Sequence, residues 1–540
     1  MMAACGRRFR RLLAMAGISL LGSGAVLGSS GAAVAAPGEP ERGGTVIAAM
    51  GNDPPSLNPD ISTGSPEASL GCMIYEAPLR FGPGFKVEPN LASSWDIAPD
   101  GLTYTFHLVS ANWQDGQPFT SADVKYTLTE VSAKYGPFFS AAAKAIKDIE
   151  TPDAHTVVIH LQRPFGPLLA SLTCEKNAAI MPVHLLAGKD VLTSPVTLNA
   201  PVGTGAFKLG EWVRGDHLTL ERNPDYWRKG EPYLDRFIAK FIPDPTSRVL
   251  GMQAGEVDFI DEYFLPLSAY KMIEHDPRFQ LHEVAYPDDD LIILNTKHPP
   301  LDRAEVRQAL MVGIDRNYIL KNVFFGVGQV GTGPIDSRMT WAYNPQVDYE
   351  KMYPYDPAKA RAMLDAAGVK PGADGVRFTI SLVFDSTRPD FVQFAEAMKR
   401  FWQDIGVNVV LKGSERAVEL KQVFADYDFD ATLQNYTTAG DPALGIDRLY
   451  VTESINRAAN FVNASQYANP EVDELFRKGR DAATEAERAK YYFEVQPILA
   501  RDLPTLAIHQ QAEIDAASKR LHGLWAAPDE QRWDAIWMEK

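Results

Sequence analysis

The chain has 540 residues, with 69 Asp and Glu against 53 Lys and Arg and a formal net charge of −16. This length exceeds what one hydrophobic core normally serves, so we expect several lobes. The acidity disfavours nucleic acid and anionic lipid as partners and favours solubility, but it names no ligand.

The start of the chain is typical of an export signal. A basic segment, Arg7–Arg11, precedes an apolar run from Leu12 to Val26 that glycines and serines interrupt, and Ala33–Ala35 forms a small-x-small cleavage signal. The run is too short and too broken to span a membrane, and no cysteine ends it as a lipoprotein signal requires. We predict that residues 1–36 are a cleaved signal peptide of the general secretory type, with the twin-arginine type as the alternative. The mature protein is then free in the periplasm.

Two cysteines remain after that segment, Cys72 and Cys174. An oxidising compartment would allow a disulfide between them, but a single pair in so large a chain is more often two buried thiols, and we expect thiols here. The sequence contains no Cys-x-x-Cys, no His-Glu-x-x-His and no group of His and Cys at metal-ligand spacing. We therefore predict neither a metal site nor a cofactor.

In chain order, the first mature segments give clear element signals. Gly44–Met50 predicts a strand, and the many turn formers of Gly51–Pro59 predict a loop. From Phe81 to about Pro195 the pattern predicts a mixed lobe. A helix over 71–79 is expected before this lobe, and within it a strand over 103–108, a helix from Thr120 to Leu128 and a strand over 155–161.

The stretch from Pro201 to Asp261 contains scaffold signals. Gly203 and Gly205 are expected to bracket a tight turn, because glycine reaches positive φ angles. Apolar residues alternate on either side of Arg214–Asp216, which predicts a β-hairpin. The remaining expected elements are a strand over 237–241, a helix over 248–254 that Gly255 closes, and a strand over 257–260.

The apolar run Leu291–Asn295 predicts a strand that crosses into a second lobe. Asp302 with Glu305 predicts a capping box for the next helix, and Asp315 predicts the cap of the helix after it. The remaining expected elements are strands over 378–384, 407–411 and 429–433, helices over 391–405, 467–479 and 485–500, and a return crossing over 506–508.

Four stretches, in order along the chain, resemble one family. They are Leu91–Leu108 with Asn112–Leu128, RNPDYWRKGEPYLD with LGMQAGEVDFI (Arg222–Asp235 and Leu250–Ile260), Leu301–Arg316, and Tyr353–Gly368. They resemble the extracytoplasmic solute-binding proteins of family 5, which serve peptide and nickel ABC importers. The resemblance spans nearly the whole mature chain, and it concerns scaffold segments rather than ligand contacts.

The resemblance and the two predicted crossings imply an α/β fold of the bilobal, class II periplasmic-binding-protein type. Two mixed-sheet lobes would be joined by a two-strand hinge, with an inserted subdomain on the first lobe. Such a hinge makes a cleft that closes on a small polar solute. The expected divisions are 37–80, 197–291 and 506–540 for the first lobe, 81–196 for the inserted subdomain and 292–505 for the second lobe.

We expect capture and delivery rather than an enzyme, because the sequence offers no recognisable nucleophile–base pair. The implied role is the periplasmic substrate-binding component of an ABC importer. It would bind a small peptide or peptide-like solute and pass it to a permease in the inner membrane, acting as a monomer. The first alternative is a non-peptide ligand such as an opine, a sugar or a chelated metal. A secreted hydrolase and a chaperone-like or sensory role are the others.

The peptide-binding members of that family hold a peptide's carboxylate with an arginine and its amino group with an aspartate. Arg388 falls at the arginine position, and a planar guanidinium suits both carboxylate oxygens; the alternative is a surface arginine beside a helix start. Thr438 falls at the aspartate position. A threonine hydroxyl cannot balance a buried ammonium, which puts the usual dipeptide recognition in doubt.

Further candidates surround these two. Asp441 is either a substitute for the missing aspartate or a brace of its loop, and Tyr436 either contacts the ligand or packs between the lobes. The resemblance places the loop that contains Asp53 at the rim of the cleft, and Asn295 ends the crossing strand. The predicted ligand-binding residues are therefore Asp53, Asn295, Arg388, Tyr436, Thr438 and Asp441.

Overall fold

The structure is a computed structural model that describes residues 40–62, 64–261, 264–265, 267–457, 459–525 and 531–540. The predicted signal peptide, residues 1–36, lies outside this part of the chain. Within the described ranges, no helix is long and apolar enough to cross a membrane.

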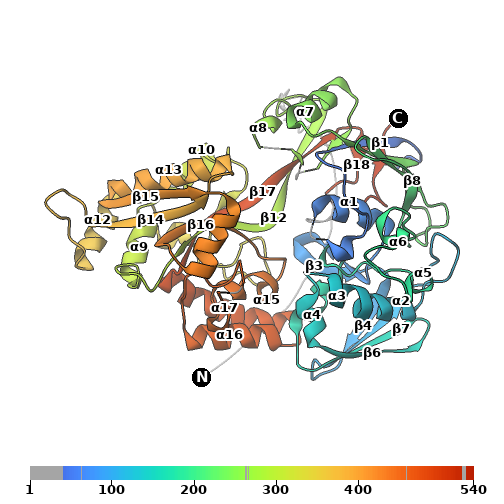
Figure 1. Cartoon of the computed structure of the whole chain (residues 1–540), viewed down its shortest axis with the longest axis horizontal. Helices are drawn as coiled ribbons and strands as arrows, with labels where there is room; N and C mark the ends of the chain where they lie inside the picture. Colours follow the sequence, from blue (N-terminus) through green and yellow to red (C-terminus); the bar gives the residue numbers. More distant parts are fainter. Residues whose placement is uncertain (1–39, 63, 262–263, 266, 458, 526–530) are drawn as a thin grey trace, which may run out of the picture. The chain divides into compact units, whose positions relative to one another are not determined.

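In the described residues, a mixed sheet of 11 strands runs through both lobes (Figure 1). Its order is β15-β14-β16-β12-β17-β11-β1-β10-β9-β8, and β13 (Gln329–Val330) pairs with β17 outside that path. The first lobe supplies β1 (Thr45–Met50), β8 (Phe207–Val213), β9 (His217–Arg222), β10 (Arg236–Phe241) and β11 (Phe259–Ile260). The second lobe supplies β14 (Phe378–Asp385), β15 (Val407–Ser414) and β16 (Ala431–Thr437).

Two long strands, β12 (Phe279–Leu294) and β17 (Thr505–Ser518), belong to both lobes. At one end β17 pairs with β11, and at the other end β12 pairs with β16. The side chains of Leu291–Leu294, at the end of β12, point alternately into two hydrophobic cores. Both faces of this run are therefore buried, which explains why it is apolar throughout. Leu291 and Ile293 enter one core, and Ile292 and Leu294 enter the other. The predicted two-lobed α/β fold with two crossing strands is confirmed.

The ladder between β12 and β17 is irregular where the strands pass from one lobe to the other. Its register shifts between Ala285 and Asp289 and again between Asp290 and Leu291. Such bulges redirect side chains locally and are frequent beside functional sites. This irregularity places the start of the Asp288–Asp290 run at the crossing.

The first lobe follows the predicted pattern closely. Strand β1 pairs in parallel with β10 and with β11, and β8 and β9 form the predicted hairpin. Helix α7 (Pro245–Ala254) ends at Gly255, whose φ of 79° is the left-handed conformation that glycine adopts most readily. The other helices of this part are α1 (Ser65–Ile74), α5 (Val183–Leu186), α6 (Pro195–Leu198) and α8 (Leu267–Tyr270), and β18 (Leu521–His522) pairs with β19 (Trp537–Met538).

Gly203 and Gly205 are required for a different reason from the predicted one. Neither has a positive φ angle. Instead, a Cβ atom at Gly203 would lie 1.8 Å from the carbonyl oxygen of Ile74, and one at Gly205 would lie 2.6 Å from the same atom. The end of α1 therefore lies directly against this backbone, where no larger residue fits.

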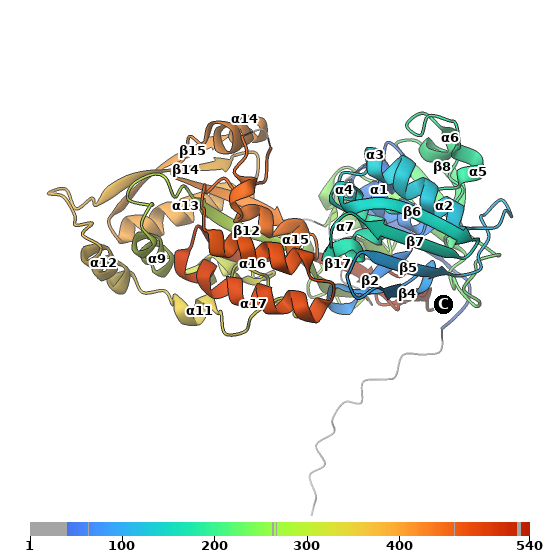
Figure 2. The same cartoon turned by 90° about the horizontal axis from the view of Figure 1, so that it is seen from below.

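The inserted segment builds its own antiparallel sheet in the order β4-β5-β7-β6 (Figure 2). Thr120 and Asp123 form a capping box at the start of α2, as the helix prediction required. The sheet strands are β4 (Ala92–Ile97), β5 (Thr103–Leu108), β6 (Ile146–Asp153) and β7 (Thr156–Leu161), and a hairpin of β2 (Leu79–Gly82) and β3 (Lys86–Pro89) precedes them. The helices are α2 (Ser121–Tyr126), α3 (Ala133–Tyr135) and α4 (Ser140–Ala145).

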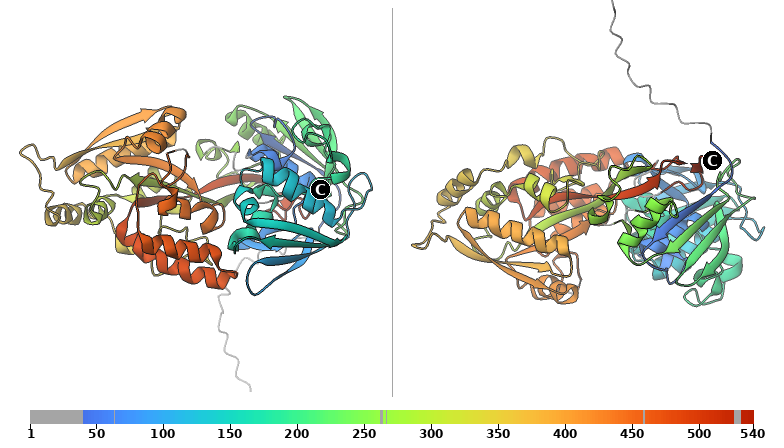
Figure 3. Two further views of the ribbon diagram at one scale, coloured as in Figure 1. Left: turned by 60° about the horizontal axis from the view of Figure 1, so that its bottom comes forward. Right: turned by 90° about the horizontal axis from the view of Figure 1, so that it is seen from above.

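In the second lobe β14 pairs in parallel with both β15 and β16. Helices α16 (Pro470–Asp481) and α17 (Glu485–Asp502), coloured red, lie side by side (Figures 2 and 3). The other helices are α9 (Ala304–Val312), α10 (Arg316–Asn322), α11 (Tyr349–Met352), α12 (Pro357–Ala366), α13 (Pro389–Asp404), α14 (Arg416–Leu420) and α15 (Pro442–Gly445).

Two local predictions were wrong. The helix expected over 71–79 is α1, which begins at Ser65 and ends at Ile74, because Tyr75 already has an extended backbone. The capping box of Asp302 with Glu305 does not form, since Arg303 is the N-cap residue of α9 and no side chain caps this helix. The cap by Asp315 is confirmed, because its side chain accepts a hydrogen bond from the backbone N–H of Tyr318.

Candidate functional site

A cavity of about 350 Å³ lies beside the crossing strand β12. A space of this volume is within the range of small-molecule sites. Segments far apart in the sequence line it: α1, the 3-10 helix Cys174–Lys176, Arg532–Asp534, Val284 and Asp288 of β12, and Thr437 and Ala439 around the end of β16. The crossing of the two lobes therefore provides the candidate site.

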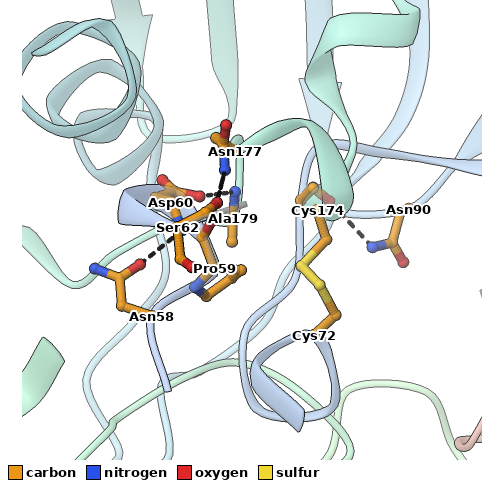
Figure 4. Close-up of a disulfide and its surroundings, with 10 residues drawn as sticks. Asn58, Pro59, Asp60, Ser62, Cys72, Asn90, Cys174, Asn177 and Ala179 are labelled. Carbon is orange, nitrogen blue, oxygen red and sulfur yellow. Dashed lines mark hydrogen bonds between the residues drawn. A yellow bond between two sulfur atoms is a disulfide. The ribbon is translucent and has the colours of Figure 1, made fainter. Parts of the chain in front are cut away.

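A disulfide joins Cys72 of α1 to Cys174, and both residues line the cavity (Figure 4). The expectation of two buried thiols was wrong, because the fold brings their Cα atoms to 6.0 Å, a distance that a disulfide spans. Beside the bond, the Asn177 side chain donates to the carbonyl oxygens of Pro59 and Ser62 at 2.6 and 2.9 Å. This wall of the cavity is thus fixed by a covalent bond and by hydrogen bonds.

Glu76 lines the cavity with a carboxylate that the protein already satisfies. The hydroxyls of Thr204 and Tyr226 and the indole N–H of Trp227 each donate to it at 2.9 Å. Burial raises the pKa of Glu76, while these donors lower it. Its hydrogen bonds hold the wall together and leave little for a solute.

Asp288 lines the same cavity, but its Oδ1 atom is buried without a hydrogen-bond partner in the described structure. Burial raises the pKa of Asp288 and the charge of Asp290 adds to the rise, while the side chains of Thr437 and Asn435 and the charge of Lys176 lower it. A buried carboxylate oxygen without a donor costs free energy. Asp288 is therefore a polar group of the cavity lining whose hydrogen-bonding requirement the described protein leaves unfilled.

The 3-10 helix after the disulfide presents an acid and a base to the cavity. Glu175 also has a buried oxygen, Oε2, without a partner among the described residues. Burial raises the pKa of Glu175, and Lys176 lowers it. The Lys176 ammonium lies 5.9 and 5.6 Å from the ring centroids of Phe81 and Phe138. The lining thus offers both signs of charge within a short distance.

Strand β17 adds a further acid near the crossing. Glu513 pairs with Val284, which lines the cavity. Burial raises the pKa of Glu513 to about 8; Asp261 and Asp288 add to the rise, while Arg388 opposes it. Acidic groups thus outnumber cations around this part of the crossing, which favours a positive charge there.

Arg388 is one of the six predicted residues, and its positive charge lowers the pKa of Glu513. It is the N-cap residue of α13, with its guanidinium in an ion pair with Asp390 and 3.8 Å from the centroid of the Phe391 ring. Burial lowers the pKa of Arg388, but Asp390 and Asp290 more than reverse this, so the pKa lies above its ordinary value. The side chain is half-buried and is engaged by its own helix.

Tyr436 in β16 and Thr438 just after it do not line the cavity. The Tyr436 hydroxyl donates to the carbonyl oxygen of Val462 at 3.0 Å. Both residues line a separate void of about 10 Å³, where the Thr438 hydroxyl has no partner among the described residues. A void of this size holds about one water molecule. Of their neighbours, Thr437 lines both spaces and Ala439 lines the larger cavity.

Asp441 is bound by Arg488, which donates to its two carboxylate oxygens at 2.6 and 2.5 Å. Asp441 also accepts from the backbone N–H of Ala443 at 2.9 Å and so caps α15. Of the two roles that the sequence left for this residue, the structure has it bracing the loop.

Asn295 and Asp53 also bond within the protein. The Asn295 amide is fully buried and donates to the carbonyl oxygens of Tyr427 and Phe429 at 3.3 and 3.1 Å. Asp53 accepts from the Trp212 indole at 2.9 Å and from the backbone N–H of Gly215 at 3.0 Å, which braces the β8–β9 hairpin. All six predicted residues are described, and none of them lines the cavity.

Comparison with known families agrees with this architecture. The family model described as bacterial extracellular solute-binding proteins, family 5 middle, matches residues 86–457. The chain belongs to this family. The match covers the inserted subdomain, the scaffold segment of the first lobe and most of the second lobe, so the predicted family is confirmed.

Relatives of this family 5 protein carry different ligand names. Heme-binding protein A of Haemophilus influenzae is 28% identical, over 84% of this chain and 85% of that protein. A glutathione-binding protein of Pectobacterium atrosepticum is 28% identical, over 89% of this chain and 92% of that protein. The structure of HbpA2 from Haemophilus parasuis is similar with a TM-score of 0.81 and 25% identity, covering 92% of this chain and 100% of that one.

The sequence did contain a signal for the residue that sequence reasoning missed. Asp288, Asp289 and Asp290 stand directly before the apolar run Leu291–Leu294 of the crossing strand. Three consecutive acids at the entrance of a buried strand require either partners or a ligand. Which of the three has an unpartnered oxygen and also lines the larger cavity depends on the register with β16 and β17, and the sequence does not show that register.

Proposed function

We propose that this family 5 member is the periplasmic substrate-binding component of an ABC importer, and that it captures a small peptide or peptide-like solute. The observation that carries the proposal is the cavity of about 350 Å³ at the strand crossing, lined by Asp288, Glu175 and Lys176. A zwitterionic solute meets both of its charges in such a lining. Closure of the lobes on the solute would exclude bulk water and strengthen those contacts.

Capture by closure of the two lobes is part of this proposal. Strands β12 and β17 connect the lobes, and their ladder is interrupted between Ala285 and Asp289. An interrupted ladder bends more readily than a continuous one, so we place the hinge there. Small-angle scattering should show a smaller radius of gyration with solute than without. An unchanged radius at saturating solute would contradict a closing cleft.

We further infer that the protein is exported, works as a monomer in the periplasm and delivers its solute to a permease in the inner membrane. The disulfide supports this location, because such bonds persist in oxidising compartments. N-terminal sequencing of the exported protein should start near Ala36 or Pro37. Retention of Met1, or a lipid on a cysteine, would contradict cleavage at this signal.

Direct solute contacts by the six predicted residues remain predictions, and Arg388 gives the sharpest test. If its guanidinium exchanges Asp390 for a solute carboxylate, Arg388→Ala should weaken binding by at least about tenfold. A near-neutral change would make it a surface arginine. Thr438→Asp should weaken the natural solute and improve dipeptides, because the new carboxylate suits an ammonium only.

Native mass spectrometry of the protein purified from the periplasm tests the function most directly. We expect a small co-purified solute, released on denaturation, that isothermal titration shows to rebind with one site. The relatives named for heme and for glutathione make a non-peptide solute the alternative. A protein that carries no solute and binds no peptide in titration would contradict the proposal.

A further inference from the structure

The crossing of β12 into the second lobe places three consecutive aspartates in three different environments. Asp290 accepts hydrogen bonds from the His509 ring at 2.9 Å and from the Gln511 side chain at 2.8 Å. Asp289 has a buried oxygen without a partner among the described residues, but it lines the void of about 10 Å³, which admits no solute. Only the unfilled oxygen of Asp288 lies in the larger cavity, among these three residues.

The charges around Asp288 do not supply its missing partner. Arg388 is ion-paired with Asp390 on its own helix. The Lys176 ammonium lowers the pKa of Asp288 but forms no ion pair with it in the described structure, and Asp290 adds negative charge. Glu513, whose pKa Asp261 and Asp288 raise, is a further acid in this region. A carboxylate in this environment gains far more from a cationic donor than an exposed carboxylate does, because the low dielectric strengthens the pair.

We propose that Asp288 is the anchor for a cationic nitrogen of the bound solute, an ammonium or a guanidinium that donates to its Oδ1 atom. This inference rests on the proposed function, since it assigns a residue and a ligand charge to the same cavity. It moves the cation contact from the loop of Thr438 and Asp441 to the crossing strand. Because Asp288 lies at the bulge between the lobes, a solute bound to it also contacts the segment around which they close.

The experiment compares wild type with Asp288→Asn, which keeps the side chain's shape and removes its charge. Asp302→Asn is the matched control, because Asp302 is exposed and its substitution changes the net charge by the same amount. Each protein is stripped of solute by unfolding and refolding with the disulfide intact. Binding is then titrated with glutathione and a set of di- to tetrapeptides, each paired with its N-acetyl derivative.

We expect wild type and Asp302→Asn to bind members with a free amino group and to bind their N-acetyl derivatives at least about tenfold more weakly. Asp288→Asn should lose that preference together with at least about tenfold in affinity for the free peptides. A second readout needs no ligand: the unfolding midpoint of solute-free Asp288→Asn should exceed that of wild type by about 1–3 °C, because the unpartnered charge is gone.

Equal affinity of wild type for free and acetylated peptides would overturn the inference, as would an Asp288→Asn protein that binds like wild type or unfolds at a lower temperature. If no peptide of either set binds, the peptide part of the proposed function fails. The co-purified solute then decides this inference separately. It must carry a protonated nitrogen, and it must be absent from Asp288→Asn; a solute without such a nitrogen would overturn it.

Discussion

Two carboxylates with buried oxygen atoms lie near the end of β16, and the fold gives them opposite surroundings. Asp441, just after the strand, has both oxygens bonded to Arg488. Asp288, opposite Thr437 in the β12–β16 ladder, keeps an oxygen without a partner among the described residues. The first stabilises the protein in the absence of any ligand. The second costs free energy until something binds, which is the property expected of a binding residue.

Arg488 shows what a compensated charge requires. Besides Asp441, its guanidinium donates to the carbonyl oxygen of Gly479 at 2.8 Å and to the Tyr492 hydroxyl at 3.0 Å. Both members of the ion pair are almost fully buried, with 5% and 4% of their side chains exposed. The desolvation of this pair is offset by a complete set of hydrogen bonds, and the loop after β16 is fixed as a result.

Removing Arg488, the ion-pair partner of Asp441, should give the largest change in stability. Arg488→Met leaves Asp441 buried without its cation, and we expect the free energy of unfolding to fall by about 3–5 kcal/mol. Arg477→Met on the exposed face of α16 is the control and should change it by less than about 1 kcal/mol. Denaturant titration measures both. Equal effects of the two changes would show that the Asp441 pair is no more important than a surface one.

The disulfide between Cys72 and Cys174 is a second feature of the cavity lining that stabilises the protein without any ligand. It closes a segment of 102 residues, so Cys72→Ser with Cys174→Ser should lower the free energy of unfolding by about 2–4 kcal/mol. Since both cysteines line the cavity, solute binding should weaken as well. Thermal unfolding with and without a reductant gives the parallel measurement on wild type. A double variant with wild-type stability would mean that packing alone holds this wall.

Asp290 and Asp288 offer the same contrast on one strand. Asp290→Ala leaves the His509 ring and Gln511 without their acceptor, and we expect a loss of about 1–3 kcal/mol in the free energy of unfolding. Asp288→Ala should change the stability of the solute-free protein by much less, because the loss of its interactions with Thr437 and Asn435 is offset by removal of the unpartnered Oδ1. Denaturant titration of the two variants compares them directly. A larger loss for Asp288→Ala would reverse their assigned roles.

The smallest effect concerns pH and Glu513. Burial raises its pKa to about 8 in the folded protein, so its protonated form stabilises the fold at low pH. That stabilisation is lost as the pH rises from its ordinary pKa of 4.5 towards 8. Glu513→Gln cannot ionise and should show a shallower loss of stability over this range. The charged groups that face Glu513 are Asp261, Asp288, Asp290 and Arg388.

Asp60 and Asp447, whose pKa values burial raises to about 7, contribute to the wild-type slope with the same sign and remain in the Glu513→Gln variant. The exposed Glu471→Gln is the control and should follow the wild-type profile. Thermal unfolding at a series of pH values measures all three proteins. A Glu513→Gln profile parallel to wild type would show that this carboxyl does not titrate in the predicted range.

The elements that local patterns specify were predictable from the sequence. The β8–β9 hairpin, the end of α7 at Gly255 and the apolar run Leu291–Leu294 all appear as expected. Each is determined by residues close together in the chain. The predictions for Gly203 and for the cysteine pair were wrong for the same reason. One depends on contact with Ile74 and the other on an approach of segments 102 residues apart, and no local pattern contains either distance.

The site was less predictable than the fold because it depends on register. At the end of β16 and just beyond it, Thr437 lines both spaces, Thr438 lines the small void and Ala439 lines the cavity, so an error of one position changes the space that a residue meets. The resemblance to a family supplied positions such as Arg388 and Thr438. Whether Asp288 finds a partner is decided by the pairing of β12 with β16 and β17, which only the structure shows.

A crystal structure of the protein with its co-purified solute tests the central claim most directly. The account predicts solute density in the cavity beside β12, with a cationic nitrogen of the solute within hydrogen-bonding distance of Asp288 Oδ1 and the Asp441–Arg488 pair unchanged. A solute bound outside this cavity, or one whose cation contacts the loop of Thr438 and Asp441 while Asp288 stays without a partner, would contradict it.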